Sequence, residues 1–88
     1  MKTNFDNLND DEIKQFYLLI SANVKKYRLE KGYSQMDLGL EIGIKSVAFF
    51  SNCESTRNNK HFNIEHLYKL AKALDKNICD FFIPSKTI

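Results

Sequence analysis

A chain of 88 residues forms one small domain, which has room for a single hydrophobic core but not for a deep substrate pocket as well, so we expect no enzyme. With three Gly, one Pro and 43% hydrophobic residues, the composition excludes a disordered chain and a loop-rich scaffold, and it favours an almost entirely helical fold. Residues 1–12 sum to −3, from one Lys and four acidic groups, so the remainder of the +2 chain sums to +5, which permits a polyanionic partner.

The first predicted element is a long amphipathic helix. Residues 1–8 show no helical periodicity and are expected to form a loose arm, after which Asn9 or Asp10 caps the helix. Acidic residues fill its first turn, where the helix dipole favours negative charge, and it ends near Gly32. Its apolar stripe, with spacings of three and four, is Ile13, Phe16, Tyr17, Ile20, Val24 and Tyr27.

Two short helices joined by a tight turn are predicted next. Ser34 caps the first of them, with Asp37 three residues later in an arrangement close to a capping box, and this helix stops before Gly43. Ser46 then caps a third helix that runs to about Cys53. Two short capped helices with a glycine in the turn between them are typical of a helix-turn-helix unit. The apolar contacts of the second helix are expected from Met36, Leu38, Leu40 and Ile42.

The third helix has two different faces. Phe50 and Cys53 lie one turn apart, with Phe49 beside them, and are expected to pack inward. The opposite face consists mostly of small residues with one amide, which would let the helix backbone enter a groove closely. This outward set is Val47, Ala48, Ser51, Asn52 and Ser55.

The chain ends in two further predicted helices. Asn63 caps a fourth helix, and Asn77 caps a final short helix that Pro84 ends. A helix-turn-helix domain at residues 9–83 is therefore followed by a tail at 84–88. The apolar side of the fourth helix is Ile64, Leu67, Tyr68, Leu70, Ala71 and Leu74.

Cysteines and histidines give no pattern of a metal or redox site. Cys53 and Cys79 have no CxxC neighbour, so we expect buried, reduced thiols. His61 and His66 fit no metal-ligand spacing, so we expect no metal, no other cofactor and no small-molecule substrate. The polar, acidic start is unlike a secretory signal and no apolar run reaches membrane-spanning length, so we expect a cytoplasmic protein with no membrane partner.

Residues 20–82 resemble the helix-turn-helix family of phage Cro and cI repressors, often called the Xre family, which includes restriction-modification controller proteins. The resemblance implies an all-α fold, a compact five-helix lambda-repressor-like DNA-binding domain, here with an extended N-terminal first helix. The matching residues are Arg28, Gly32, Ser34, Gln35, Leu38, Gly43, Ser46, Phe50, Ser51, Glu54, Leu67, Leu70, Ala71 and Leu74.

By this resemblance the third helix lies in the major groove of double-stranded DNA. Val47 and Ala48 would contact thymine methyl groups, and Asn52 would pair with an adenine edge. Gln35 would touch a phosphate, and polar residues on both sides of the third helix would clamp others. The implied DNA-binding set is Gln35, Lys45, Ser46, Val47, Ala48, Ser51, Asn52, Arg57, Asn58 and Lys60.

The resemblance also implies structural and subunit contacts. Arg28 and Glu54 would form an ion pair that ties the first helix to the end of the third. The C-terminal helix region often pairs subunits in such proteins, so the expected dimer interface is Phe81, Phe82 and Ile83, although these residues are also candidates for the core. The expected function is that of a homodimeric, sequence-specific transcriptional regulator on a palindromic operator.

Some positions depart from the family pattern. Lys45 is an extra residue in the turn, Gly39 stands where Ala is preferred, and the loop from Ser55 to His61 is longer than usual. The apolar residues at 47–49 stand where many relatives carry Gln, Arg or Lys. A protein–protein interaction module on the same fold, with weak or lost DNA binding, is therefore the alternative.

Overall fold

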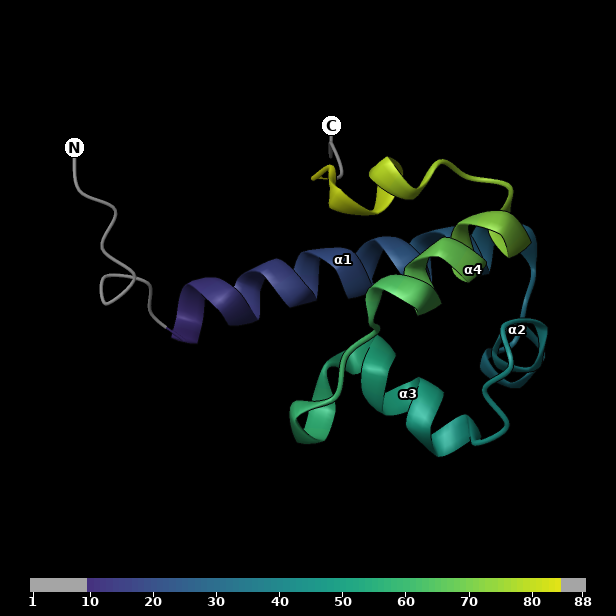
Figure 1. Ribbon diagram of the computed structural model, residues 1–88, viewed down its shortest axis with the longest axis horizontal. Helices are drawn as coiled ribbons and strands as arrows, with labels where there is room; N and C mark the ends of the chain where they lie inside the picture. Colours follow the sequence, from purple (N-terminus) through teal and green to yellow (C-terminus); the bar gives the residue numbers. More distant parts are fainter. Residues whose placement is uncertain (1–9, 85–88) are drawn as a thin grey trace.

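The computed structural model describes residues 10–84, which form four α-helices and two 3-10 helices without strands (Figure 1). This confirms an all-α fold for these residues, but the expected fifth helix is a short 3-10 helix. The predicted arm at 1–8, the alternative cap Asn9 and residues 85–88 of the tail lie outside the described residues. The elements are α1 (Asp10–Lys31), α2 (Gln35–Glu41), α3 (Val47–Ser55), η2 (Arg57–Asn59), α4 (Ile64–Leu74) and η3 (Ile78–Phe82).

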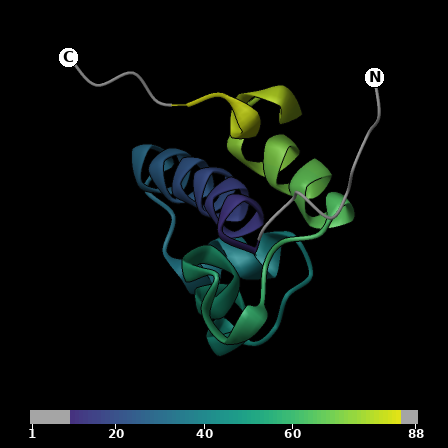
Figure 2. The ribbon, with the colours of Figure 1, turned by 90° about the vertical axis from the view of Figure 1, so that its left-hand side faces the viewer.

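The longest helix, α1, is the support on which the other elements pack. Viewed along α1, η3 and α4 lie above and beside it, while α2 and α3 lie below (Figure 2). The first half of α1 projects to the left of Figure 1, beyond the rest of the fold. The core therefore forms around the second half of α1 only.

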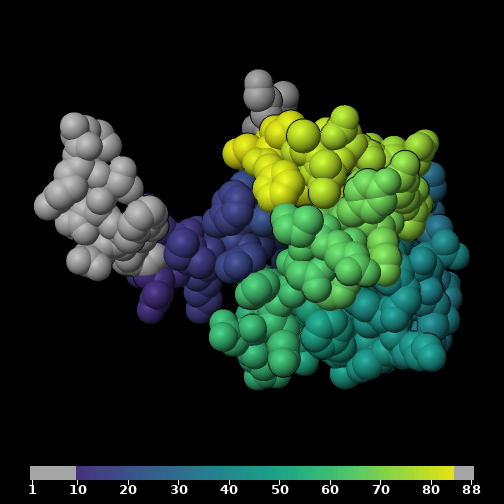
Figure 3. Space-filling view, viewed as in Figure 1, coloured from purple at the N-terminus to yellow at the C-terminus, as the bar shows by residue number. Residues whose placement is uncertain are grey.

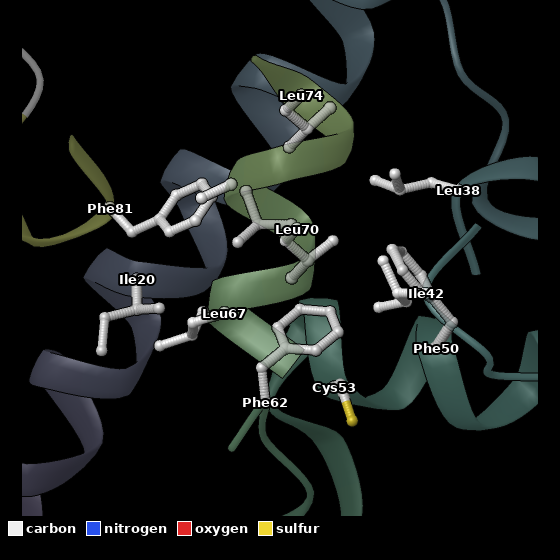
Figure 4. Packing of buried hydrophobic residues seen from close by; sticks show 12 residues of the cluster. Ile20, Leu38, Ile42, Phe50, Cys53, Phe62, Leu67, Leu70, Leu74 and Phe81 are labelled. Atoms are coloured by element: carbon white, nitrogen blue, oxygen red, sulfur yellow. The ribbon is translucent and has the colours of Figure 1, made fainter. Parts of the chain in front are cut away.

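One hydrophobic core joins all the elements except η2. In Figure 4, α4 runs through the middle of this core, with Ile20 and Phe81 on one side and Leu38 and Phe50 on the other. Full burial of one such large apolar side chain contributes about 1.5–3 kcal/mol. The buried residues are Ile20, Val24, Leu38, Ile42, Phe50, Cys53, Phe62, Leu67, Leu70, Ala71, Leu74 and Phe81.

Several residues expected in apolar contacts are instead exposed. Ile13 and Phe16 lie in the projecting half of α1, where the apolar stripe continues past the end of the core. The expected burial of Cys79 is wrong as well, because this residue lies on the outer side of the single short turn of η3. Helical spacing predicted the apolar stripes, and apolar neighbours predicted the burial of Cys79, but neither signal shows where the packing partners end. In the other helices, four apolar residues are each more than half exposed, namely Met36, Leu40, Ile64 and Tyr68.

A buried amide attaches η3 to α1. Asn23 is 2% exposed, and its Nδ2 atom donates hydrogen bonds to the carbonyl oxygens of Phe81 and Ile83, at 2.8 and 2.9 Å. The Asn77 side chain caps η3 by accepting from the Cys79 N–H, as predicted for the last helix. The C-terminal segment is thus held by specific polar contacts in addition to the burial of Phe81.

Candidate nucleic-acid interface

Both helices of the helix-turn-helix unit begin at the predicted serine caps. The Ser34 hydroxyl accepts a hydrogen bond from the Asp37 N–H at 2.9 Å, and the Ser46 hydroxyl accepts one from the Phe49 N–H at 3.1 Å. Each cap satisfies a backbone donor that the first turn of a helix leaves unpaired. The third helix runs two residues past Cys53, to Ser55.

The turn between α2 and α3 folds back closely over α2. The Ile44 N–H donates to the Gly39 carbonyl at 2.8 Å, and Gly43 has a φ of +85°, which favours glycine. A Cβ atom at position 39 would lie 3.1 Å from the Ile44 carbonyl oxygen and 3.4 Å from a ring carbon of Phe50. Glycine at position 39 is thus explained by the close approach of this turn.

A buried ion pair ties the unit to α1. Arg28 donates through Nε to Glu54 Oε2 at 2.8 Å and through Nη2 to Oε1 at 3.0 Å, which is the expected ion pair in a bidentate geometry. The Nη1 atom of Arg28 also donates to the Tyr33 carbonyl at 2.8 Å. Three segments of the chain, α1, the start of the helix-turn-helix unit and α3, are therefore fixed relative to one another.

The side chain of Gln35 belongs to the same network. Its Nε2 atom donates to Glu54 Oε1 at 2.9 Å, and the side chain is half-buried. In this arrangement the amide nitrogen contacts a carboxylate of the protein, whereas the resemblance implied a contact with a DNA phosphate. Gln35 positions α2 against α3.

The division of α3 into an inward and an outward face agrees with the sequence prediction. Phe50 and Cys53 are fully buried, and Phe49 is half-buried with its ring edge against His66, the ring centroids lying 6.1 Å apart. The expected outward residues other than Ser55 fall into two groups. Val47 and Ala48 are exposed, and Ser51 and Asn52 are half-buried. Ser55 is exposed, but its hydroxyl donates to the Ser51 carbonyl at 2.8 Å.

Exposed polar and basic residues flank α3 at both ends. Lys45 and Ser46 immediately precede the helix, and Arg57, Asn58 and Lys60 follow it in and beside η2. Three residues of the latter segment, at positions 56, 58 and 59, have φ values of 53–57°, in the left-handed region that residues other than Gly and Asn seldom adopt. The loop is thereby compact and stays close to the end of α3.

The cysteines and histidines have structural surroundings. Burial raises the pKa of the Cys53 thiol to about 11, although Lys60 opposes the shift, so this thiol stays protonated at neutral pH. His66 caps α4 reciprocally with Asn63, and the His61 ring stacks on Tyr17 with centroids 3.8 Å apart. Within the described part of the chain, no three His, Cys, Asp or Glu side chains gather closely enough to bind a metal ion.

The expected dimer residues do not form one surface. Phe81 is fully buried in the core, so its assignment to a subunit interface is wrong: its ring fills the space between α1 and α4. Phe82 is half-buried and stacks on Phe16, with ring centroids 6.0 Å apart, and Ile83 is exposed. Sequence reasoning placed Phe16 in the core and thus missed it as a surface residue. The available signal was that the apolar stripe of the first helix begins two turns before Ile20.

Comparison of the chain with protein-family models, with curated proteins and with solved structures finds no match. Among residues 10–84, no helix combines the length and the apolar character that a membrane crossing requires.

Proposed function

We propose that this chain is a sequence-specific DNA-binding transcriptional regulator with a lambda-repressor-like fold of the Xre type, and that it acts as a homodimer on a palindromic operator. The observation that carries the proposal is the geometry of α3, a capped helix that is buried on one side and presents small side chains on the other. Small residues at this face would let the helix approach base edges closely, as recognition helices do.

The dimensions of α3 support a place in the major groove. An α-helix with its side chains is about 10–12 Å across, and the major groove of B-DNA is about 12 Å wide, so a helix such as α3 fits lengthwise in the groove. Lys45 at one end and Arg57 and Lys60 at the other would therefore approach phosphates on the two edges of the groove. Asn52, on the exposed face between these ends, would pair with adenine N6 and N7.

The buried network of Arg28, Gln35 and Glu54 supports the same proposal. It fixes the angle of α3 against α2 and α1 by charge-assisted hydrogen bonds, so α3 would be presented to DNA as part of a rigid unit. A rigid reading helix loses little conformational entropy on binding.

The alternative, a protein-interaction module, is favoured by one observation. Met36 and Leu40 on α2 are each 56% exposed, and Val47 at the start of α3 is 47% exposed. Apolar side chains of this size on neighbouring helices suit a protein partner better than a phosphate backbone. Asp37 and Glu41, which are exposed on the same α2 helix, would repel phosphates.

The two functions are distinguished by measuring the affinity of the protein for fragments of genomic DNA over a range of salt concentrations. We expect Asn52→Ala to weaken binding to the preferred fragment by roughly 1–3 kcal/mol and to relax its preference for that sequence. Lys45→Ala should weaken binding to every fragment about equally and lower the salt slope by about 1. Lys25→Ala removes the same charge from an exposed position of α1 and should change neither quantity. Loss of affinity for all sequences alike in Asn52→Ala would contradict base reading by this residue.

A further inference from the structure

The first half of α1 carries an apolar stripe that the described fold covers only in part. We name residues 10–19 the overhang, because the buried part of α1 begins at Ile20. Ile13 and Phe16 of the overhang are 46% and 49% exposed, although they lie in line with the core residues of the same helix. Exposed apolar side chains in line with the buried face of a helix indicate a surface that packs against a partner.

The overhang forms one wall of a groove. Figure 3 shows its outer end projecting from the rest of the molecule, with a hollow between it and the segment that carries η2. The groove on the η2 side has a volume of about 620 Å³ and lies between Ile13, Tyr17 and Leu18 on the overhang and residues 55–61 opposite. At its inner end the ring of His61 stacks on Tyr17. Asp10 and Lys14 also line the overhang side, so this wall combines apolar and charged side chains, whereas the loop wall is mostly polar.

The two walls carry opposite charge. The overhang sums to −2, from three acidic residues at 10–12 and Lys14, whereas the loop at 55–61 sums to +2, from Arg57 and Lys60. The acidic residues lie in the first turn of the overhang, whereas the loop wall is basic and the rest of the overhang wall is mainly apolar. An amphipathic helix with an acidic end fits this groove when it runs antiparallel to the overhang, because its acidic end then meets the basic loop. The overhang itself has these properties.

We propose that a second copy of this chain places its own overhang in this groove, so that two overhangs lie antiparallel about a two-fold axis. Each copy then supplies one helix and one groove, which gives a closed and self-complementary pair. The acidic end of each overhang meets the basic loop of the other copy, and Ile13, which lines the groove, loses its exposure to water. Phe82 and Ile83 continue the apolar surface on the other side of the overhang, through the stack of Phe82 on Phe16.

This interface deepens the homodimer part of the proposed function and is independent of base reading. Arg57 and Lys60 belong both to the groove and to the surface proposed for phosphates, so changes at these residues would not separate the two. Changes at apolar residues of the overhang do separate self-association from DNA binding, because these residues lie outside the proposed DNA-contacting set.

Sedimentation equilibrium of the full chain over a concentration series tests the interface. We expect wild type to approach twice the chain mass of 10.3 kDa. Ile13→Glu should weaken self-association by at least roughly tenfold, because it puts a charge into the apolar contact of the groove. Leu29→Glu is the matched control, since Leu29 is 58% exposed on the same helix but outside the overhang, and it should still dimerise. Circular dichroism of each variant should show unchanged helix content.

The attraction between the acidic overhang and the basic loop is tested by salt, because raising the salt concentration should weaken the wild-type dimer. A monomeric wild-type chain at every concentration would overturn the proposal, and so would a folded Ile13→Glu variant that dimerises as well as Leu29→Glu. A dimer that fails to bind DNA would contradict only the DNA binding of the proposed function, whereas a monomer that binds DNA would contradict this interface and the homodimer part of the proposed function.

Discussion

At the scale of single residues, the contacts that hold the helix-turn-helix unit in place are polar and buried. Arg28 and Glu54 are each 7% exposed, and all the hydrogen bonds between them are charge-assisted. A buried ion pair adds little stability compared with an apolar pair of similar shape, but removal of one partner leaves an uncompensated charge in the interior. The pair therefore acts mainly to fix the geometry of α1 and α3.

Replacement of Arg28 should destabilise the fold strongly. We expect Arg28→Ala to lower the free energy of unfolding by about 3–5 kcal/mol, because Glu54 would be left buried and the Tyr33 carbonyl would lose its donor. Urea denaturation followed by circular dichroism measures the change. Arg28→Lys keeps the charge but not the bidentate geometry, so its free energy of unfolding should lie between those of wild type and Arg28→Ala. A loss below about 1 kcal/mol in Arg28→Ala would mean that the pair behaves as an exposed one.

The capping histidine of α4 should make stability depend on pH. Burial against Phe62 and Phe49 lowers the pKa of His66 below its usual 6.5, with Lys69 lowering it further and Glu65 acting in the opposite direction. Since the folded-state pKa is below the unfolded one, this contribution to stability is complete above about pH 6.5 and is lost as the pH falls toward the folded-state pKa. Protonation also removes the Nδ1 acceptor of the Asn63 N–H.

Urea midpoints measured from about pH 7.5 down to about pH 5.5 test this sign. We expect wild type to lose stability over this range. His66→Gln keeps a capping acceptor at the same position but does not titrate, so it should lose less. Equal slopes for the two proteins would show that the imidazole of His66 is not the responsible group.

At the scale of elements, sequence patterns predicted well the features that depend only on neighbouring residues in the chain. The caps at Ser34, Ser46, Asn63 and Asn77 all formed, because a cap depends on residues two or three positions away. Exposure of Met36 and Leu40 was missed, since it depends on which face of a two-turn helix meets α3 and α4. The contact of Gln35 with Glu54 was missed for the same reason: it joins residues 19 positions apart.

The close packing of the turn on α2 gives a prediction at this scale. Helix propensity alone would make Gly39→Ala stabilising by roughly 1 kcal/mol. We expect net destabilisation instead, because the added Cβ meets the Ile44 carbonyl oxygen, a backbone atom whose residue is hydrogen-bonded to position 39. Thermal unfolding of Gly39→Ala measures the net effect of helix propensity and of this close contact. The control Ala22→Gly, at an exposed position of α1, measures helix propensity alone. A raised melting temperature in Gly39→Ala would show that the turn relaxes freely.

At the scale of the whole molecule, the core and the proposed functional surfaces are separate. Residues of α1, α4 and η3 enclose the apolar interior, α3 shares that interior with one face only, and the overhang projects beyond it. The proposed DNA-reading surface is centred on α3 and the proposed subunit-pairing surface on the overhang, and the two share Arg57 and Lys60. Substitutions at their other residues can change one surface and leave the core intact. The outward face of α3 was predictable from sequence periodicity. The overhang was not, because its apolar stripe has the same spacing as a buried one.

Reading of DNA by α3 is most directly tested by mixing the purified chain with fragments of genomic DNA at low salt and sequencing those that it retains. We expect a small set of fragments that share an inverted repeat, with half-sites centred about 10–10.5 base pairs, or a multiple of this, apart. Retention of that set should be lost on moderate increases in salt. Retention of no fragment, or of all fragments equally, would contradict a sequence-specific regulator and favour the protein-interaction module.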